Sequence, residues 1–497
     1  MNFLQIINKI KCSYKIASKI GYEDLDIEEI SIDSRKINIS KNTIFFALEG
    51  KNSSVEKNIK NAINSGAKII VSRDLVDSDQ VISIKTEHVF MLLVEFLKIF
   101  YNPLPLNIYA VTGTNGKTSV AEYTRQILNL INKKSASIGT LGVICEEKIQ
   151  GIDNSSLTTP DIVSLYKSLY TLKKNNINDV AIEVSSIGLD QARVAGLNID
   201  VASFTNFTQD HLDYHKNMED YFFSKMLLFE AVMKDKSAVV LNADIKEFAK
   251  IKRMCQSKKH FIFEYGFNAL DLKIVEIIPK DYGQDFVIEF NGKKYSSSIN
   301  IFGEFQVYNI LCAMGMVMAK NFFTEEDFEI LLENLINIKS ADGRMEKVAS
   351  LNNGAQIYID FAHSPDALQN VLALARKLNP KKLYVLFGCG GDRDSSKRPM
   401  MGKIASDLAD FIIVTDDNPR FENPEIIRKQ IIANISNGNF IEVSERKEAI
   451  SKAIGMLQDN DVLIIAGKGH EKYQIIKDQK HEFDEKIIVE DIIKKLN

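Results

Sequence analysis

Short runs of almost wholly apolar residues recur along this chain and alternate with segments of helical periodicity. Strands this apolar are typical of parallel sheets covered by helices on both faces, because neither face of such a strand meets water. The runs lie at residues 108–111, 180–184, 201–204, 238–241, 356–359, 383–387, 411–414 and 462–465. A more alternating segment at 286–301, with Asn291-Gly292 as its turn, predicts an antiparallel hairpin at a sheet edge. The sequence therefore predicts an α/β protein.

Two breaks in this rhythm predict three domains. Asn102-Pro103-Leu104-Pro105 interrupts the pattern as a linker would, and the α/β rhythm restarts after Ser340-Ala341-Asp342. A chain of 497 residues is long enough for about three domains. We therefore expect a small α/β domain at 1–105, a mostly parallel central domain at 106–340 and a third α/β domain at 341–497.

The composition disfavours several classes of protein. The net charge is -4 with acidic and basic residues interspersed, which argues against a nucleic-acid or membrane-surface partner. Five cysteines without a C-x-x-C pair predict a reducing compartment rather than a disulfide framework or a zinc ribbon. We see no secretory signal and no apolar run of the ~20 residues that span a bilayer. We expect a cytoplasmic monomer that acts on small molecules and does not insert into a membrane.

The segment Thr112–Ser119 joins an apolar strand to a helix and has the chemistry of a triphosphate cradle. Its glycines let backbone N–H groups approach phosphate oxygens, Lys117 neutralises charge, and the Thr118 hydroxyl can reach Mg²⁺. The loop is shorter than the usual G-x-x-x-x-G-K-[ST] pattern, since the position five before Gly116 is Val111. An ordinary Gly-Asn turn is the alternative, but Lys-Thr-Ser at a helix start is hard to explain as turn chemistry.

Polar residues follow the other central strands, where the ligands of open parallel sheets bind. Glu183 ends the second strand and could serve a metal or nucleotide, or cap a helix. His211 and His215 follow the third strand; without an H-E-x-x-H glutamate or a nearby cysteine, Mg²⁺ fits this region better than zinc. Lys225 lies in an apolar helical segment, where a lysine usually extends its amine to solvent. If buried, it would have a lowered pKa and a nucleophilic amine.

The third domain also carries polar loops after its strands. Turn chemistry alone could explain each loop, but several such loops in succession predict a binding rim. With Arg393 and Arg420 present, this rim could grip carboxylates through bidentate guanidinium contacts. The loops lie at residues 360–365, 388–394, 415–420 and 467–471.

Taken in order, these motifs resemble those of the Mur ligases of bacterial cell-wall synthesis, and most specifically of the members that add diaminopimelate. The resemblance covers essentially the whole chain. It implies an N-terminal domain that binds a UDP-linked substrate, a central ATP-binding domain of P-loop type, and a Rossmann-like C-terminal domain that binds an amino acid. It rests on Asp33-Ser34-Arg35, residues 112–119, Thr158-Thr159-Pro160, residues 183–186, Gln191, Arg193, residues 210–215, Lys225, Asn309, residues 343–346, 360–365, 388–394, 417–420 and 467–471.

The resemblance implies a ligand for most of the matching residues. ATP would be bound by Gly113, Thr114, Asn115, Gly116, Lys117, Thr118, Ser119, Asn309, Arg344 and Asp360. The UDP-linked substrate would be bound by Ser34, Thr158, Thr159, Ser185, Gln191 and Arg193. The incoming diaminopimelate would be bound by Arg393, Asp417, Asn418, Pro419, Arg420, Gly467 and Glu471.

The same resemblance implies the metal-binding and catalytic residues. Thr118 and Glu183 would lie near one Mg²⁺, and His211 and Lys225 near a second, with Lys225 as an N-carboxylated (carbamylated) lysine. This reverses the expectation that Lys225 reaches solvent. The chemistry is coherent, because a desolvated neutral amine can capture CO₂ and become an oxygen ligand. Lys117, Glu183, His211 and Lys225 are the expected catalytic residues.

The implied reaction is ATP-dependent amide formation for peptidoglycan precursor synthesis. Meso-2,6-diaminopimelate would join the D-glutamyl γ-carboxylate of UDP-N-acetylmuramoyl-L-Ala-D-Glu through an acyl phosphate. Diaminopimelate differs from lysine by a distal carboxylate, with which Arg420 can pair, and the lysine-adding relatives lack this arginine. The alternatives are a lysine-adding or folylpolyglutamate-type ligase and, from another class, a P-loop ATPase.

The chain departs from the family pattern at three places. Ile187 stands where histidine commonly follows the Ser-Ser pair, and Phe361 where tyrosine usually precedes Ala-His. Segment 50–57 lacks the usual Asp-Gly-His-like run, so we infer no uridine contact from it.

Overall fold

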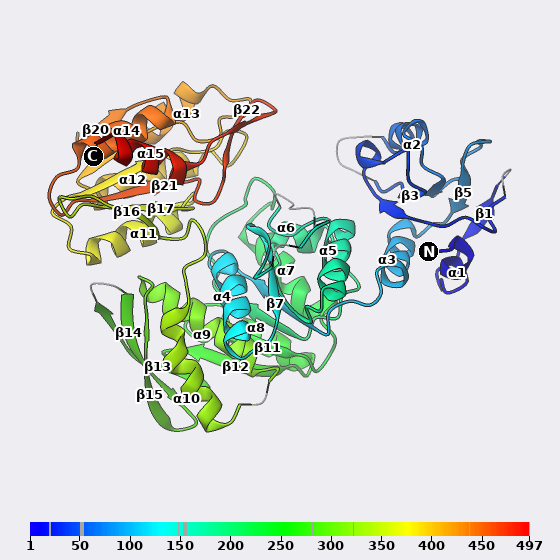
Figure 1. The fold of residues 1–497 in the computed structure, drawn as a ribbon, viewed down its shortest axis with the longest axis horizontal. Helices are drawn as coiled ribbons and strands as arrows, with labels where there is room; N and C mark the ends of the chain where they lie inside the picture. The colour runs from blue at the N-terminus through cyan, green and yellow to red at the C-terminus, as the bar shows by residue number, and fades with distance from the viewer. Residues whose placement is uncertain are drawn as a thin grey trace.

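The computed structural model describes residues 1–18, 21–49, 54–147, 149–152, 157–280, 283–321, 323–436 and 438–496; of the divergent segment 50–57, residues 50–53 lie outside the described residues. The three larger sheets follow one another along the chain, and each forms the centre of its own α/β body (Figure 1). The N-terminal body stands apart on the right of the view, whereas the C-terminal body lies over the central body. The predicted three-domain α/β architecture is confirmed.

The N-terminal body is built on a mostly parallel five-stranded sheet. Strand β1 runs antiparallel to β5, and the other neighbours run parallel. Alternate side chains of β3 (Thr43–Phe46) point to opposite faces: Phe46 packs toward α1 and α3, and Phe45 toward α2. The strand order is β1 (Lys15–Ala17), β5 (Ile82–Lys85), β4 (Ile69–Ser72), β3 (Thr43–Phe46) and β2 (Glu29–Ser31). The helices are α1 (Phe3–Ile7), α2 (Val55–Asn64) and α3 (Val89–Phe100).

The central body has a ten-stranded sheet that is parallel through its middle and antiparallel at both edges. The predicted runs at 108–111, 180–184, 201–204 and 238–241 are confirmed as β6, β9, β10 and β11. The order is β15 (Lys293–Ile299), β14 (Gly283–Phe290), β13 (Leu272–Lys280), β12 (Phe261–Gly266), β11 (Ala238–Asn242), β10 (Val201–Phe204), β6 (Asn107–Thr112), β9 (Asp179–Glu183), β7 (Ser135–Gly139) and β8 (Gly142–Cys145).

The predicted hairpin turn is also confirmed. Asn291 (φ 50°) and Gly292 (φ 76°) both adopt left-handed backbone between β14 and β15, as a two-residue hairpin turn requires. Helices cover both faces of the central sheet. One face carries α4 (Lys117–Leu130), α9 (Glu304–Met318) and α10 (Glu325–Asn334). The other face carries α5 (Ile162–Lys174), α7 (Met218–Leu227) and α8 (Phe248–Ser257).

The C-terminal body has a six-stranded sheet in which β16 alone among the described strands runs antiparallel to its neighbour. The order is β16 (Glu346–Ser350), β17 (Gln356–Asp360), β21 (Val462–Ala466), β18 (Leu383–Phe387), β19 (Phe411–Val414) and β20 (Phe440–Glu442). One face carries α11 (Pro365–Lys377), α12 (Lys397–Leu408) and α13 (Pro424–Ile432). The other carries α14 (Arg446–Met456) and α15 (Glu485–Leu496). The four runs predicted here are confirmed as β17, β18, β19 and β21.

Within the part of the chain that the structure describes, no helix combines the length and apolar character that a membrane span needs.

Candidate active site

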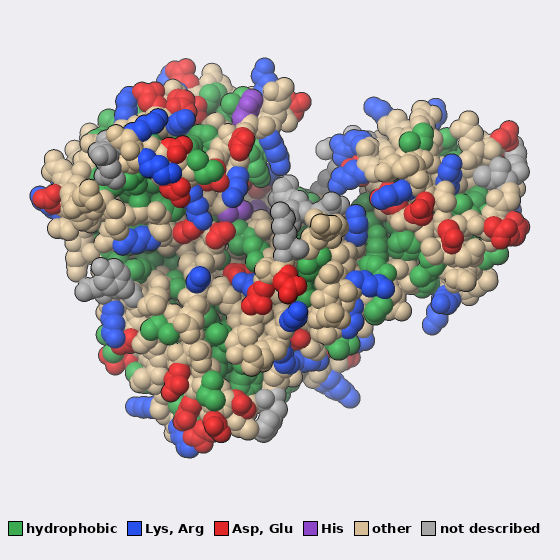
Figure 2. All heavy atoms as spheres, in the orientation of Figure 1, with side chains coloured by type: hydrophobic (Ala, Val, Ile, Leu, Met, Phe, Trp, Pro, Cys, Tyr) green, Lys and Arg blue, Asp and Glu red, His purple; other side chains and the backbone are tan. Residues whose placement is uncertain are grey.

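One cavity of about 340 Å³ collects most of the residues predicted to bind substrates. It lies where the C-terminal body meets the central body, and charged and histidine side chains gather along this seam (Figure 2). Ile187 and Phe361, the two departures from the family pattern, also line it. From the central body it is lined by Thr114, Asn115, Gly116, Lys117, Thr118, Thr140, Leu157, Thr158, Glu183, Ser185, Ile187, Arg193, Asp210, His211 and Asp213. From the C-terminal body it is lined by Arg344, Phe361, His363, Gly390, Arg393, Asp394, Lys397, Asp417, Asn418, Arg420, Gly467 and Glu471.

The phosphate loop is held in a conformation that its glycines make possible. Gly116 is left-handed (φ 86°) and caps α4, so that Lys117 begins the helix. Gly113 has φ 144°, and a Cβ there would lie 1.9 Å from Thr205 Oγ1. Lys117 Nζ donates to Gly113 O (3.0 Å) and Thr114 O (2.7 Å), which places an ammonium at the centre of the loop. The loop can thus present a cation and the positive end of α4 to an anion.

Glu183 and Thr118 meet beside this loop. Thr118 Oγ1 donates to Glu183 Oε2 at 3.0 Å, and the backbone N–H of Thr140 donates to Glu183 Oε1 at 2.8 Å. Glu183 is buried, and burial raises the pKa of its carboxyl, against the opposing effect of nearby Lys117. A buried carboxylate beside a hydroxyl is a hard oxygen set of the kind that Mg²⁺ prefers. Thr140 was not predicted, because no motif marks it.

Lys225 is buried, so the interpretation that its amine reaches solvent is wrong. Its side chain is 1% exposed, and Nζ donates to Gly113 O at 2.7 Å and lies 4.3 Å from the centre of the Tyr221 ring. Burial, and then the neighbouring ammonium of Lys117, lower the pKa of Lys225 well below its ordinary value. Burial therefore favours the neutral amine, which is the form that reacts with CO₂.

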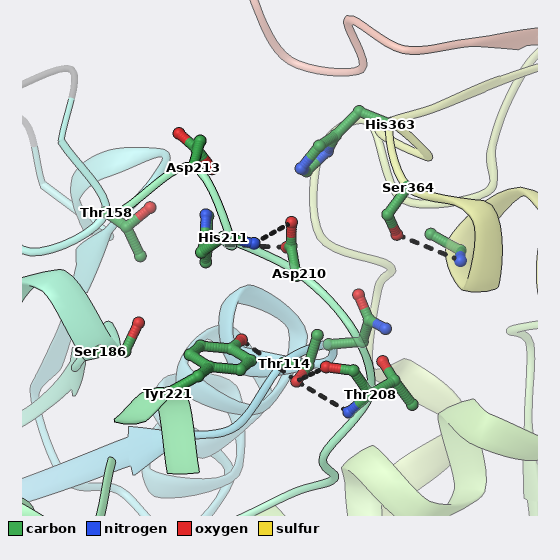
Figure 3. A network of polar contacts seen from close by, with 12 residues as sticks. Thr114, Thr158, Ser186, Thr208, Asp210, His211, Asp213, Tyr221, His363 and Ser364 are labelled. Carbon is green, nitrogen blue, oxygen red and sulfur yellow. Dashed lines mark hydrogen bonds and ion pairs between the residues drawn. The ribbon is translucent and has the colours of Figure 1, made fainter. Parts of the chain in front are cut away.

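Asp210 and His211 lie on the loop after β10, opposite His363 from the C-terminal body (Figure 3). His211 Nε2 is 3.6 Å from Asp210 Oδ2, and loss of water contact lowers the pKa of His211 to about 4. His215 points elsewhere: its Nε2 is 2.9 Å from Ser186 Oγ. Among the described residues, no group of three His, Cys, Asp or Glu side chains is arranged to hold a metal. A metal ion at this place would therefore also need oxygen ligands other than unmodified Asp and Glu side chains.

Contacts between the two bodies cross the cavity. Arg344 Nη2 donates to Thr118 Oγ1 at 3.1 Å, and Asn115 Nδ2 donates to Asp366 Oδ2 at 2.7 Å. The Arg344 guanidinium also lies 4.7 Å from the centre of the Phe361 ring. Residues of the C-terminal body therefore touch the phosphate loop directly.

Four predicted ATP-binding residues do not line this cavity, and one of them is Gly113 of the phosphate loop. Asn309 lines a second cavity of about 420 Å³ between the central body and α11, and a Cβ on Gly116 would lie 2.5 Å from Asn309 Oδ1. Asp360 is buried, accepts the backbone N–H of Met345 at 2.6 Å, and has its pKa raised to about 6 by burial. Ser119 is buried in the first turn of α4.

The residues predicted to bind the UDP-linked substrate divide into two groups. Arg193 Nη1 donates to Thr159 O at 2.7 Å, and Arg193 Nη2 donates to Gln191 Oε1 at 2.7 Å. Thr159 Oγ1 in turn accepts the backbone N–H of Ser185 at 2.9 Å. Thr158 Oγ1 accepts from Thr140 Oγ1 at 3.1 Å. Ser34 is not brought to this cluster: it is buried in the short helix η1 (Ser34–Lys36) of the N-terminal body.

The residues predicted to bind the amino acid gather at the far end of the cavity. Arg420 Nη1 donates to Gly391 O at 2.9 Å, and Asn418 Nδ2 donates to Glu471 Oε2 at 2.8 Å. Burial, and then the neighbouring Arg393, lower the pKa of Arg420. Two guanidinium groups near one another favour a bound anion, such as a carboxylate. Pro419 does not line this cavity.

Comparisons with known proteins match the chain over nearly its whole length. Two family models match: the Mur ligase middle domain over residues 111–317, and the Mur ligase glutamate ligase domain over residues 343–469. A UDP-N-acetylmuramoyl-L-alanyl-D-glutamate--2,6-diaminopimelate ligase of Rickettsia bellii is 41% identical over 471 residues, which are 93% of this chain and 95% of the relative. A relative of the same name from Rickettsia montanensis is 39% identical over 482 residues, covering 95% and 97%. A solved structure of a ligase of this name aligns with a TM-score of 0.66 at 28% identity, covering 100% of this chain and 99% of that one.

Proposed function

The chain belongs to the Mur ligase family, and we propose that it is the ligase that adds meso-2,6-diaminopimelate to UDP-N-acetylmuramoyl-L-alanyl-D-glutamate. The new amide joins an amine of diaminopimelate to the γ-carboxylate of the D-glutamyl residue, at the expense of ATP, in peptidoglycan precursor synthesis. We propose that it acts as a monomer, and that it acts in the cytoplasm, where its five free cysteines would stay reduced. One observation carries this proposal: Lys117 of the phosphate loop and Arg420 of the C-terminal body line the same cavity.

ATP binding is assigned to the phosphate loop and the cavity beside it. Lys117 and the N-terminus of α4 face the phosphates, and the cavity lined by Asn309 lies next to Gly116, at the place where the nucleoside would extend. Arg344 reaches the same loop from the C-terminal body. A phosphoryl group bound here is therefore surrounded by cationic side chains from two domains, which stabilises the charge that spreads over it during transfer.

The residues beside the loop fit Mg²⁺ at one place and, after modification, at a second. Thr118 and Glu183 supply hard oxygen donors that already touch one another. Lys225 is a buried amine with a lowered pKa that would become an oxygen donor when carbamylated, and it shares the neighbour Tyr221 with His211. Bound Mg²⁺ would neutralise phosphate charge and orient the phosphoryl group.

The reaction follows in two displacements. A γ-carboxylate oxygen of the D-glutamyl residue attacks the γ-phosphorus of ATP, the bond to the ADP oxygen breaks, and an acyl phosphate forms. The neutral amine of diaminopimelate then attacks the acyl carbon, and loss of phosphate and a proton gives the amide, ADP and inorganic phosphate. Lys117 and Arg344 hold the transferring phosphoryl group, and Arg193 and Thr158 hold the muramyl dipeptide at the rim of the cavity.

The C-terminal end of the cavity supports diaminopimelate as the amino acid. Arg420 and Arg393 suit its distal carboxylate, and the Glu471 carboxylate suits the ammonium on the same carbon. Lysine lacks that carboxylate and would leave Arg420 without a carboxylate partner, which a buried polar site disfavours.

Phosphate release from ATP tests this function. We expect release only when both UDP-N-acetylmuramoyl-L-Ala-D-Glu and diaminopimelate are present, and far less with lysine. Equal turnover with lysine would identify a lysine-adding ligase, and glutamate addition to a folate would identify a folylpolyglutamate-type enzyme. ATP hydrolysis that is independent of the UDP-linked acceptor would identify a P-loop ATPase.

A further inference from the structure

A two-stranded hairpin, β22 (Tyr473–Ile476) and β23 (Gln479–Glu482), holds the backbone of Arg420. Arg420 N donates to Ile475 O at 3.2 Å, and Lys477 N donates to Arg420 O at 2.8 Å. Arg420 has a left-handed backbone (φ 50°), which residues with a Cβ disfavour. The two hydrogen bonds to the hairpin offset this strain, so the direction of the Arg420 side chain depends on where the hairpin lies.

The hairpin also holds the residues before Arg420. Gln474 Nε2 donates to Asp417 O at 2.7 Å, and the next backbone N–H of β22 donates to Asn418 Oδ1 at 2.9 Å. Lys468 completes the attachment: its fully buried ammonium donates to Asn418 Oδ1 at 2.9 Å and to Tyr473 O at 2.8 Å. The loop that carries Arg420 and the first residue of the hairpin are thus joined through one lysine.

Lys468 also balances the charge of this region. Its Nζ is 3.7 Å from Glu471 Oε2. Burial by itself raises the pKa of Asp417, but Lys468 and then Arg446 bring it below the ordinary value. Neither Lys468 nor Gln474 lines the cavity, so both act on a bound amino acid through other residues.

We propose that strand β22, through Gln474 and Lys468, is the positioning element that aims Arg420 and thereby sets the preference for an amino acid with a distal carboxylate. The inference rests on the proposed function. A guanidinium pairs with a carboxylate through two parallel N–H donors, so a small displacement of Arg420 weakens that pairing. Lysine has no distal carboxylate and does not depend on the direction of Arg420.

The test compares two glutamine substitutions in the same hairpin. Gln474→Ala removes the hydrogen bond to Asp417 O, whereas Gln479→Ala changes an exposed residue of the outer strand. We expect Gln474→Ala to raise KM for diaminopimelate about tenfold, the effect of about one hydrogen bond. KM for ATP and kcat/KM for lysine should stay unchanged, and Gln479→Ala should behave as the wild type.

Hydroxylamine separates the amino-acid site from the ATP site. It attacks the acyl carbon of the acyl phosphate, displaces phosphate and leaves a hydroxamate, without using Arg420. Lys468→Met should abolish diaminopimelate turnover yet keep hydroxamate formation, and Lys468→Arg should restore part of the turnover. Hydroxamate formation by the variant also shows that the ATP site is folded.

Failure of the positioning role and failure of the proposed function give different results. If Gln474→Ala changes kcat/KM for diaminopimelate and lysine equally, or changes neither, the positioning role is overturned, even if Lys468→Met does not fold. If the wild type forms neither hydroxamate nor the diaminopimelate product, the proposed function is overturned instead.

Discussion

Replacing Lys225 by methionine should stabilise the protein while abolishing turnover. The amine is buried, and burial lowers its pKa well below its ordinary value, so folding disfavours the protonated lysine. The cost is about 1.4 kcal/mol for each unit by which the pKa is lowered. Methionine avoids that cost and gives up one hydrogen bond, worth about 1 kcal/mol. Gly113 O keeps a donor in Lys117, so no buried carbonyl is left without a partner.

The expected gain at pH 7 is the cost of the lowered pKa, about 1.4 kcal/mol per unit, less about 1 kcal/mol for the lost hydrogen bond. Its pH dependence has a definite sign. Between the folded pKa and 10.5, the unfolded chain binds the extra proton, so the stability of the wild type rises with pH by about 1.4 kcal/mol per unit. The advantage of Lys225→Met should therefore be largest near neutral pH and shrink as pH approaches 10.5.

Urea unfolding at pH 7, 8 and 9 in bicarbonate-free buffer measures this difference. Lys250→Met is the matched control, because Lys250 is exposed on α8 and should show no pH-dependent gain. The reasoning is refuted if Lys225→Met is less stable than the wild type at pH 7, or if the difference does not change with pH.

Turnover tests the proposed carbamate on the same residue. Lys225→Ala should lower kcat by about a hundredfold or more, since a lost oxygen ligand removes several kcal/mol of charge stabilisation. A short-chain carboxylic acid should restore part of the activity, because it can place a carboxylate in the space that the side chain vacates. Wild-type activity in Lys225→Ala would contradict the carbamate hypothesis.

Three further substitutions test separate parts of the site. Arg420→Ala should lower kcat/KM for diaminopimelate about a hundredfold, as expected when a charged partner is left unpaired, but change it little for lysine; an equal loss for both amino acids would contradict the assignment. Glu183→Gln should abolish turnover while ADP binding persists. Because burial raises the pKa of Glu183, the pH at which the wild-type rate falls to half its maximum on the acid side should lie above 4.5. A midpoint at or below 4.5 would show that this carboxyl does not control turnover. Gly113→Ala should raise KM for ATP at least about tenfold, because its Cβ would lie 1.9 Å from Thr205 Oγ1. Gly455→Ala, which meets nothing within 4 Å, is its control.

The strands that sequence reasoning found are those buried on both faces. Residues 238–241 and 462–465 are apolar throughout, and a parallel sheet covered by helices is the structure that removes such strands from water. Strand β7 was not predicted from the sequence, because Ser135 and Ser137 interrupt its apolar pattern, although both are buried. Strands β22 and β23 were not predicted, because each has only 4 residues and β23 is wholly polar. Their role comes from backbone hydrogen bonds to another loop.

The candidate site shows the same division. Lys117, Thr118 and Arg420 could be singled out from the sequence because each lies in a compact motif whose chemistry is local. Thr140 and Lys468 could not, because their importance lies in partners from other segments: Thr140 donates to Glu183, and Lys468 joins a loop to a hairpin.

The sequence by itself determined the α/β architecture, the phosphate loop and the chemical character of the loops that end the strands. These follow from short-range rules of periodicity, glycine conformation and side-chain chemistry. Only the tertiary structure decided that the phosphate loop and Arg420 line one cavity, and that Lys225 is buried. Burial and charge depend on which distant segments pack together: Lys225 contacts Gly113, 112 residues earlier in the chain, and the burial that this packing produces lowers the pKa of its amine.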